Sequence, residues 1–168
     1  RAGRIATEES TRLVERLKEI TVGDAQVFVE PVREHRFVVV FRGRGLGDRV
    51  CDTDPQATGV APLEAEGADD ASQKTARIAR EFVAAARELL AGEKQANGLT
   101  MRGFAARPDL PSFNEVYGLR AAAIAVYPMY KGLARLVGME VVGDARTLDE
   151  QCAVMEECWG DYDFFFVH

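Results

Sequence analysis

Cysteine and histidine are scarce in this sequence of 168 residues, and their scarcity excludes several kinds of site. The three cysteines, Cys51, Cys152 and Cys158, are odd in number and include no C-x-x-C pair. They indicate neither a disulfide framework nor a zinc knuckle, and we expect reduced thiols in a cytoplasmic protein. The two histidines, His35 and His168, are too few for a histidine-rich metal site. We expect His168 to be a strand-end residue, because it could ligate a metal only with residues supplied from elsewhere.

Excess positive charge and long apolar runs are also absent. Acidic residues outnumber Lys and Arg by 27 to 21, and the net charge of −6 argues against a general nucleic-acid binder. The longest apolar runs, such as Phe37–Phe41 and Ala121–Val126, are too short to cross a bilayer. The composition, with 47% apolar and 29% charged residues, is typical of a soluble globular protein without a membrane partner.

The common short catalytic motifs are missing as well. The sequence contains no G-x-S-x-G, P-loop, H-E-x-x-H or complete G-x-G-x-x-G. Residues 43–47 (GRGLG) match the last motif only in part, because Asp48 stands where a third glycine is required. No catalytic residue and no metal ligand is therefore assigned within the chain.

Two amphipathic helices are predicted in the first 108 residues. One has Thr7 as its N-cap, and the other begins at a capping box of Asp70 and Gln73 and runs to about Leu90. Their apolar stripes are Leu13, Val14, Leu17 and Ile20 in the first helix, and Ile78, Ala79, Phe82, Val83, Ala86, Leu89 and Leu90 in the second.

Three strands rich in β-branched and aromatic residues are predicted in the same region. Gln26–Val32 and Arg36–Arg42 flank a short turn and indicate an antiparallel hairpin, with Pro31 at a sheet edge. Leu99–Ala105 is expected to join this hairpin, while residues 43–62 form a long loop of the kind that is functional or mobile. Residues 1–108 should therefore form an α+β layer, with helices on one face of a mostly antiparallel sheet.

Strand and helix alternate after Pro108–Pro111, which predicts a parallel, right-handed β-α-β-α-β segment over residues 109–168. The expected strands are Leu119–Val126, Met139–Val142 and Asp163–Val167. One helix begins at Pro128 and is stopped by Gly138, and the next begins at a capping box of Thr147 and Glu150. Their apolar stripes are Met129, Tyr130, Leu133, Leu136 and Val137, and then Leu148, Cys152, Met155 and Trp159. Core packing is expected of Tyr127, Tyr130 and Trp159. The whole chain is thus of the α/β class.

Arginines beside glycines are the main candidates for a binding site. Glycine lets a ligand approach the backbone, and arginine binds phosphate or carboxylate through two parallel hydrogen bonds. The hypothesis is that several of these groups converge on one small dianion, and the alternative is that they are solvated or ion-paired surface residues. The candidates are Arg4 near the start of the chain, His35 and Arg36 at the hairpin turn, Arg42 at the end of the second strand, and Arg102.

Asp52, Asp54 and Lys131 are further candidates. The two carboxylates could hydrogen-bond sugar-like hydroxyl groups, hold arginines in place, or form an ordinary Asx turn before Pro55. Lys131 lies in the first turn of the Pro128 helix, and a helix N-terminus with a lysine can bind an anion. The alternative is an ordinary βα unit without a binding site.

Five segments in a fixed order connect the chain to a known family. They are RAGRI at Arg1–Ile5, HRFVVVFRGRGL at His35–Leu46, CDTDP at Cys51–Pro55, RGFAARPDLPSFNEVYGLRAAAIAVYPMYKGLARLVGM at Arg102–Met139, and DYDFFFVH at Asp161–His168. This set closely resembles the archaeal-type branch of the cofactor-independent (2,3-bisphosphoglycerate-independent) phosphoglycerate mutases, in the alkaline phosphatase superfamily. Cys51 departs from the serine of many members, so a hydroxyl role is not expected there.

The resemblance implies a division of the chain and a chemistry. Residues 1–108 would be an inserted substrate-binding domain, and residues 109–168 a parallel part of the phosphatase-like core. A metal-activated serine and two divalent ions (Mn, Mg, Zn or Co) would transfer the phosphoryl group between 3-phosphoglycerate and 2-phosphoglycerate. The serine and the metal ligands are expected outside residues 1–168, so the chain alone should be an inactive fragment that binds no metal. The implied substrate-binding residues are Arg4, His35, Arg36, Arg42, Asp54, Arg102 and Lys131.

Two other functions stay open from the residues. A non-enzymatic module that binds anions would explain why no nucleophile is visible. A phosphatase or phosphonate hydrolase on the same core would use the same cationic groups.

Overall fold

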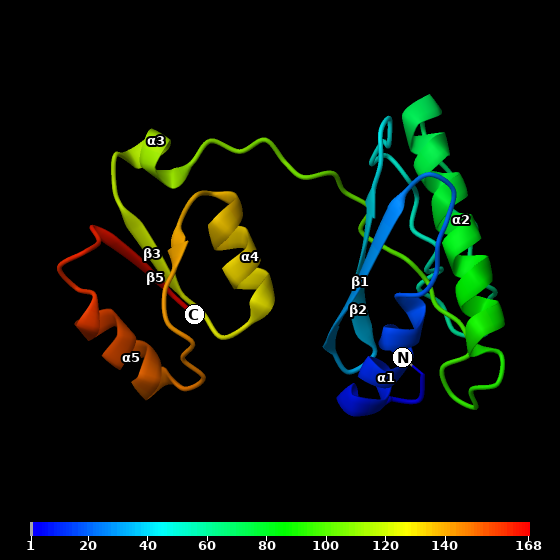
Figure 1. Ribbon diagram of the computed structural model, residues 1–168, viewed down its shortest axis with the longest axis horizontal. Coiled ribbons are helices and arrows are strands. Elements are labelled where there is room, and N and C mark those ends of the chain that lie inside the picture. Colours follow the sequence, from blue (N-terminus) through cyan, green and yellow to red (C-terminus); the bar gives the residue numbers. More distant parts are fainter. Residues whose placement is uncertain (1) are drawn as a thin grey trace. The chain divides into compact units, whose positions relative to one another are not determined.

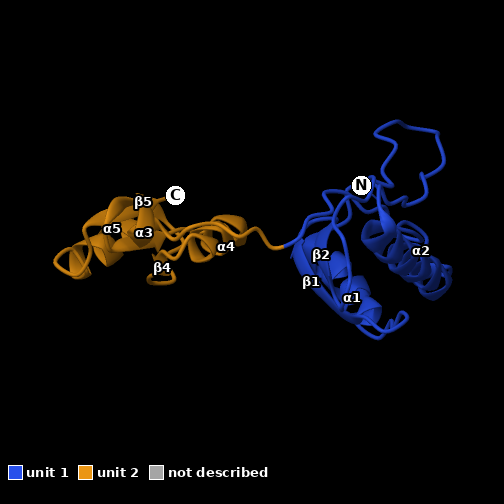
Figure 2. Cartoon of the chain, turned by 90° about the horizontal axis from the view of Figure 1, so that it is seen from above, with its two compact units in different colours: residues 1–106 blue, residues 107–168 orange. Residues whose placement is uncertain are grey.

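The computed structural model describes residues 2–168 and divides the chain into two compact units. The first unit is residues 1–106 and the second is residues 107–168 (Figure 2). Each unit is described by itself below. Within the described part of the chain, no helix has both the length and the apolar character that a membrane crossing requires.

The first unit contains two helices and a β-hairpin (Figure 1). The helices are α1 (Thr7–Leu17) and α2 (Asp70–Leu90), and the strands are β1 (Gln26–Arg33) and β2 (Arg36–Arg42). The strands pair antiparallel, with Gln26 opposite Arg42 and Arg33 opposite Arg36, which confirms the predicted hairpin. The register shifts between Pro31 and Arg33, because proline has no N–H to contribute to the ladder.

The core of this unit lies between the two helices and one face of the hairpin. The predicted stripe of α1 is buried, and Val29 of β1 and Phe82 of α2 are at most 1% exposed. The Phe82 ring meets Phe41 of β2 edge-on, at 5.7 Å between centroids. The opposite face of the hairpin stays exposed, and it carries Arg36, Val38, Val40 and Arg42 in alternation along β2.

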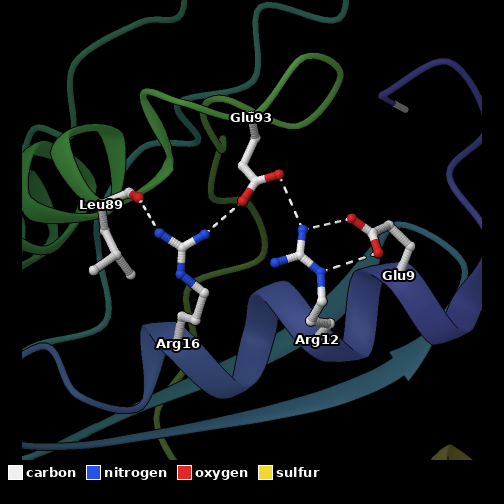
Figure 3. Close-up of polar contacts among 5 residues, drawn as sticks. All are labelled: Glu9, Arg12, Arg16, Leu89 and Glu93. Carbon is white, nitrogen blue, oxygen red and sulfur yellow. Dashed lines mark hydrogen bonds and ion pairs between the residues drawn. The ribbon is translucent and has the colours of Figure 1, made fainter.

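Ion pairs of Arg12 and Arg16 with Glu93 connect α1 to the chain just after the C-terminal end of α2 (Figure 3). Glu93 lies 2.5 Å from Arg16 Nη1 through one carboxylate oxygen and 3.0 Å from Arg12 Nη2 through the other. Arg16 also donates to the carbonyl of Leu89, one of the last α2 carbonyls, which have no partner within the helix. The cluster therefore adds a charged contact between the helices at the rim of their apolar interface.

Both predicted helix caps in this unit were wrong by one residue. Ala6 is the N-cap of α1, and Thr7 Oγ1 instead accepts a hydrogen bond from the Glu34 N–H at 3.0 Å. Asp69 is the N-cap of α2, and its carboxylate accepts from the Ser72 N–H at 2.8 Å. Gln73, the expected capping partner, donates its side-chain amide to the Gly67 carbonyl.

The predicted third strand, Leu99–Ala105, is also wrong. The hairpin has two strands, and residues 99–105 form no ladder with it. Gly103 adopts a positive φ of 72°, which breaks an extended strand. The backbone of this segment bonds instead to the loop around Thr53, so its polar groups are satisfied without a sheet.

The second unit is built on a parallel sheet with strand order β4-β3-β5. Its strands are β3 (Ala121–Ile124), β4 (Glu140–Val141) and β5 (Phe164–Val167), and α4 (Pro128–Leu136) and α5 (Leu148–Glu157) lie on opposite sides of them (Figure 1). β3 is the central strand and is buried along its whole length. The parallel pairing, Pro128 at the first helical position and the Thr147–Glu150 capping box confirm the prediction for this segment.

Side-chain placement on these helices differs from the prediction. Met129, Leu133, Leu148 and Trp159 are 50–68% exposed, and Cys152 is exposed too. The helices are buried instead through Ala134 on α4 and Gln151 on α5. Small or amide side chains sit at these contacts because the alanines of β3 allow the helices to approach closely. The prediction that Trp159 packs in the core was therefore wrong. Its exposed ring stacks on Phe165, at 5.6 Å between centroids.

A short helix that the sequence analysis missed precedes β3. This helix, α3 (Phe113–Tyr117), begins at a capping box in which Ser112 and Glu115 exchange hydrogen bonds. Gly118 ends it with a positive φ of 69°. The S-x-x-E signature was readable in the sequence, directly after Pro108–Pro111.

Candidate functional site

The cationic candidates of the first unit fall into two groups, one at each end of the hairpin. Arg36 begins β2 beside the turn, and Arg42 ends the same strand. A strand rises about 3.3 Å per residue, so their Cα atoms are roughly 20 Å apart. Both side chains leave the exposed face of the hairpin, but the small dianion that the sequence analysis expects is too short to lie against both ends at once.

The group at the hairpin turn comprises Arg4, His35 and Arg36. Arg36 Nη1 lies 2.7 Å from the Glu34 carboxylate, and the hydrogen bond from this guanidinium lowers the Glu34 pKa. His35 is half-buried at the turn, and Arg4 is exposed with a positive φ of 62°. The bond from Glu34 N–H to Thr7 draws the chain just after Arg4 toward the turn.

Arg42 and Arg102 lie near the other end. The Arg42 guanidinium carbon is 4.8 Å from the centre of the Phe28 ring, a cation–π contact that leaves its N–H donors free to bind other groups. Phe41 and Met101, the residues just before these two arginines, pack against the same small cluster of Val50, Ala65, Ala76 and Ala79. This shared packing brings the two segments together.

Asp54 and Arg102 are in direct contact. Arg102 Nη1 lies 3.5 Å from Asp54 Oδ2, while Asp54 Oδ1 accepts the Gln56 N–H at 2.9 Å. Asp54 therefore both holds an arginine and forms the Asx turn, two of the three roles that the sequence left open. Asp52 has a different task, since its Oδ1 accepts the Gly103 N–H at 2.8 Å.

Lys131 belongs to the second unit. Its Nζ lies 3.2 Å from the Asp144 carboxylate, and its side chain is only 20% exposed. Nearby in the same unit, the rings of Tyr130 and His168 are in contact, with 3.7 Å between centroids. Sequence reasoning missed Gln151, which donates to the carbonyls of Ile124 and His168 and joins the carboxyl ends of β3 and β5.

The described residues offer no metal centre. Among residues 2–168, no group of three or more His, Cys, Asp or Glu side chains is arranged to hold an ion. The residues of this part of the chain therefore do not fit the two divalent ions that the resemblance implies, and no step through a metal is assigned to them.

Comparisons with known proteins identify the family. The model of the 2,3-bisphosphoglycerate-independent phosphoglycerate mutase family matches residues 1–96. The chain is 50% identical over 170 residues to a Thermotoga neapolitana protein, and 49% identical over 173 residues to one from Thermus thermophilus. Both are named "Probable 2,3-bisphosphoglycerate-independent phosphoglycerate mutase", and each match covers all of this chain.

A solved structure agrees with these matches. The cofactor-independent phosphoglycerate mutase from Thermoplasma acidophilum superimposes with a TM-score of 0.75 over 99% of this chain, at 25% identity. The chain spans 42–43% of the length of the two curated relatives and 49% of the solved chain. Since the family model covers more than half of the residues, this chain belongs to the 2,3-bisphosphoglycerate-independent phosphoglycerate mutase family.

Proposed function

We propose that this chain is part of a cytoplasmic phosphoglycerate mutase that interconverts 3-phosphoglycerate and 2-phosphoglycerate, and that it supplies cationic groups that bind the substrate. The observation that supports this proposal most strongly is that all of this chain matches relatives named as probable phosphoglycerate mutases, at 49–50% identity. The serine nucleophile and two divalent ions would come from the remainder of the protein. The proposed division is an inserted substrate-binding domain over residues 1–108 and a segment of the phosphatase-like core over residues 109–168.

The chemistry explains why such an enzyme needs a cationic clamp. When the phosphoryl group moves to the enzyme, glycerate must stay bound until the group returns to its other hydroxyl. If glycerate escapes, water hydrolyses the phosphoenzyme and the mutase becomes a phosphatase. Arginines that bind the glycerate carboxylate through paired hydrogen bonds would prevent this loss.

The proposed clamp residues of the first unit lie in two groups, one at each end of the hairpin. Arg42 and Arg102 form the group that binds the small acid, because packing brings their segments together and Arg102 is 68% exposed. Arg4, His35 and Arg36 form the second group, at the hairpin turn, and Lys131 of the second unit is a further proposed substrate-binding residue. Asp54 borders the clamp at Arg102.

Arg102→Ala in the full-length protein tests the proposal. We expect kcat/KM for 3-phosphoglycerate to fall roughly 10- to 100-fold, the loss associated with a hydrogen-bonded charged group, and the share of substrate released as free phosphate to rise. Arg87→Ala, at an exposed position near the end of α2, is the control. Unchanged kinetics would remove Arg102 from the clamp, and free phosphate as the only product of the wild type would favour a phosphatase.

A further inference from the structure

We propose that the loop of residues 48–54 positions Arg102 for its anionic ligand, and that Asp54 acts through Arg102 rather than on the ligand itself. This inference rests on the proposed function for the identity of the ligand. The geometry that supports it lies wholly within the first unit.

The segment that carries Arg102 has no regular secondary structure of its own. Its backbone is held on both sides of Arg102 by the 48–54 loop. The Met101 N–H donates to Thr53 Oγ1 at 2.7 Å, and the Met101 carbonyl accepts from the Thr53 N–H at 2.8 Å. After Arg102, the Gly103 N–H donates to Asp52 Oδ1 and the Ala106 N–H donates to Asp48 Oδ2.

Thr53 is the buried part of this anchoring. The residue is only 4% exposed, and its hydroxyl both donates to the Met101 carbonyl and accepts from the Met101 N–H. Both polar functions of a buried hydroxyl are thereby satisfied by one residue. The backbone next to Arg102 is therefore fixed before any ligand arrives.

Asp54 restricts the side chain of Arg102. One carboxylate oxygen faces Arg102 Nη1, and the other accepts the Gln56 N–H, so the carboxylate cannot turn freely. A guanidinium has five N–H donors, and this one is 68% exposed, so most of its donors remain available to a carboxylate or phosphate. An exposed ion pair contributes little to stability, so orientation of the guanidinium is the effect that the contact can have.

The negative charge of Asp54 should also affect where an anionic ligand binds. An anionic ligand that approached the carboxylate directly would be repelled, whereas one that binds the outer N–H groups of Arg102 is attracted. Asp54 should thus favour ligands on the solvent side of the guanidinium. This role distinguishes it from a carboxylate that hydrogen-bonds substrate hydroxyl groups.

Asp54→Asn separates these roles, because the asparagine oxygen can still accept the Gln56 N–H while the charge facing Arg102 is lost. In the full-length enzyme we expect KM for 3-phosphoglycerate to rise about three- to tenfold, with a smaller change in kcat, as for a loss of uniform binding. Glu64→Gln removes one charge from an exposed loop position and serves as the matched control.

The double variant decides whether Asp54 acts through Arg102. In the Arg102→Ala background, Asp54→Asn should change kcat/KM less than about twofold. Multiplied effects of the two changes would overturn the inference, since Asp54 would then act on the substrate or on the fold.

A second measurement does not depend on activity. Labelling of the full-length protein with phenylglyoxal, read by mass spectrometry of the peptide that carries Arg102, should be at least twofold faster in Asp54→Asn than in the wild type or Glu64→Gln. Equal rates would contradict positioning even if the enzyme proved to be an active mutase. Faster labelling in a protein without mutase activity would support positioning and reject the proposed function.

Discussion

Arg36 and Arg42 leave the same exposed face of strand β2 but stand at its opposite ends. They are six positions apart along an extended strand, which corresponds to roughly 20 Å. The Phe28, Val38 and Val40 side chains lie exposed on the face between them. The two arginines therefore have different neighbours, and they should differ in their contribution to binding.

Arg42→Ala should impair the full-length enzyme more than Arg36→Ala. The Arg42 segment shares its packing with the Arg102 segment, whereas Arg36 is engaged by Glu34 at the turn. We expect kcat/KM to fall roughly tenfold or more for Arg42→Ala and less than about threefold for Arg36→Ala. Steady-state kinetics with 3-phosphoglycerate measure both, and the reverse order would move the clamp to the hairpin turn.

Gly67→Ala should destabilise the first unit. A Cβ at this position would overlap backbone atoms of Ser72 and Gln73 in the first turn of α2. Overpacking against backbone typically costs about 1–3 kcal/mol, which for a chain of this size lowers Tm by about 2–12 °C. Thermal unfolding of the 168-residue chain, followed by circular dichroism, measures the shift.

Gly92→Ala is the matched control for this change. A Cβ there would meet no atom within 4 Å, and Gly92 lies just beyond the end of α2. Its Tm should stay within about 2 °C of the wild type, as for most surface substitutions. If both variants unfolded at the wild-type temperature, the close contact between Gly67 and the first turn of α2 would be disproved.

Local patterns predicted most of the first unit, and the errors have physical causes. The hairpin and the α1 stripe follow from side-chain periodicity, which depends on residues a few positions apart. Leu99–Ala105 has the composition of a strand, but its backbone partners are Thr53 and Asp52, about fifty residues earlier. No local pattern reports such a distant partner, and the Asp54–Arg102 contact was hidden for the same reason.

The second unit shows a different limit. Periodicity identified apolar faces on α4 and α5, but it does not say which neighbour a face meets. Within the described chain, Ala134 and Gln151 are the buried residues of these helices, whereas Met129, Leu133 and Leu148 remain exposed. A buried glutamine that joins two strand ends carries no sequence signature, so Gln151 could not have been found.

Asp69→Asn should make the stability of the chain less sensitive to acid. The hydrogen bond from the Ser72 N–H lowers the pKa of Asp69 below its usual value of 3.8. A carboxyl group whose pKa is lower in the folded state stabilises the fold above its unfolded pKa, and this stabilisation is lost as pH falls through the folded pKa. The affected window therefore lies below about pH 4.

Asparagine is a good N-cap without a titrating charge, so Tm of Asp69→Asn near pH 7 should change little. Its Tm should then fall less steeply than that of the wild type as pH drops below about 4. Asp69→Ala, which removes the cap at every pH, should lower Tm at neutral pH as well. Parallel pH profiles for Asp69→Asn and the wild type would show that this carboxylate does not contribute to acid unfolding.

Glu93→Gln should weaken the contact between α1 and the end of α2 (Figure 3). The glutamine can accept a hydrogen bond from one arginine, but it no longer balances the charges of both Arg12 and Arg16. We expect Tm to fall by about 2–4 °C in low salt, and the difference from the wild type to shrink as salt screens the pair. Glu88→Gln, at an exposed position of α2, should leave Tm nearly unchanged in either condition. A Tm decrease that is equal for both variants, or independent of salt, would mean that the apolar contacts alone hold the two helices together.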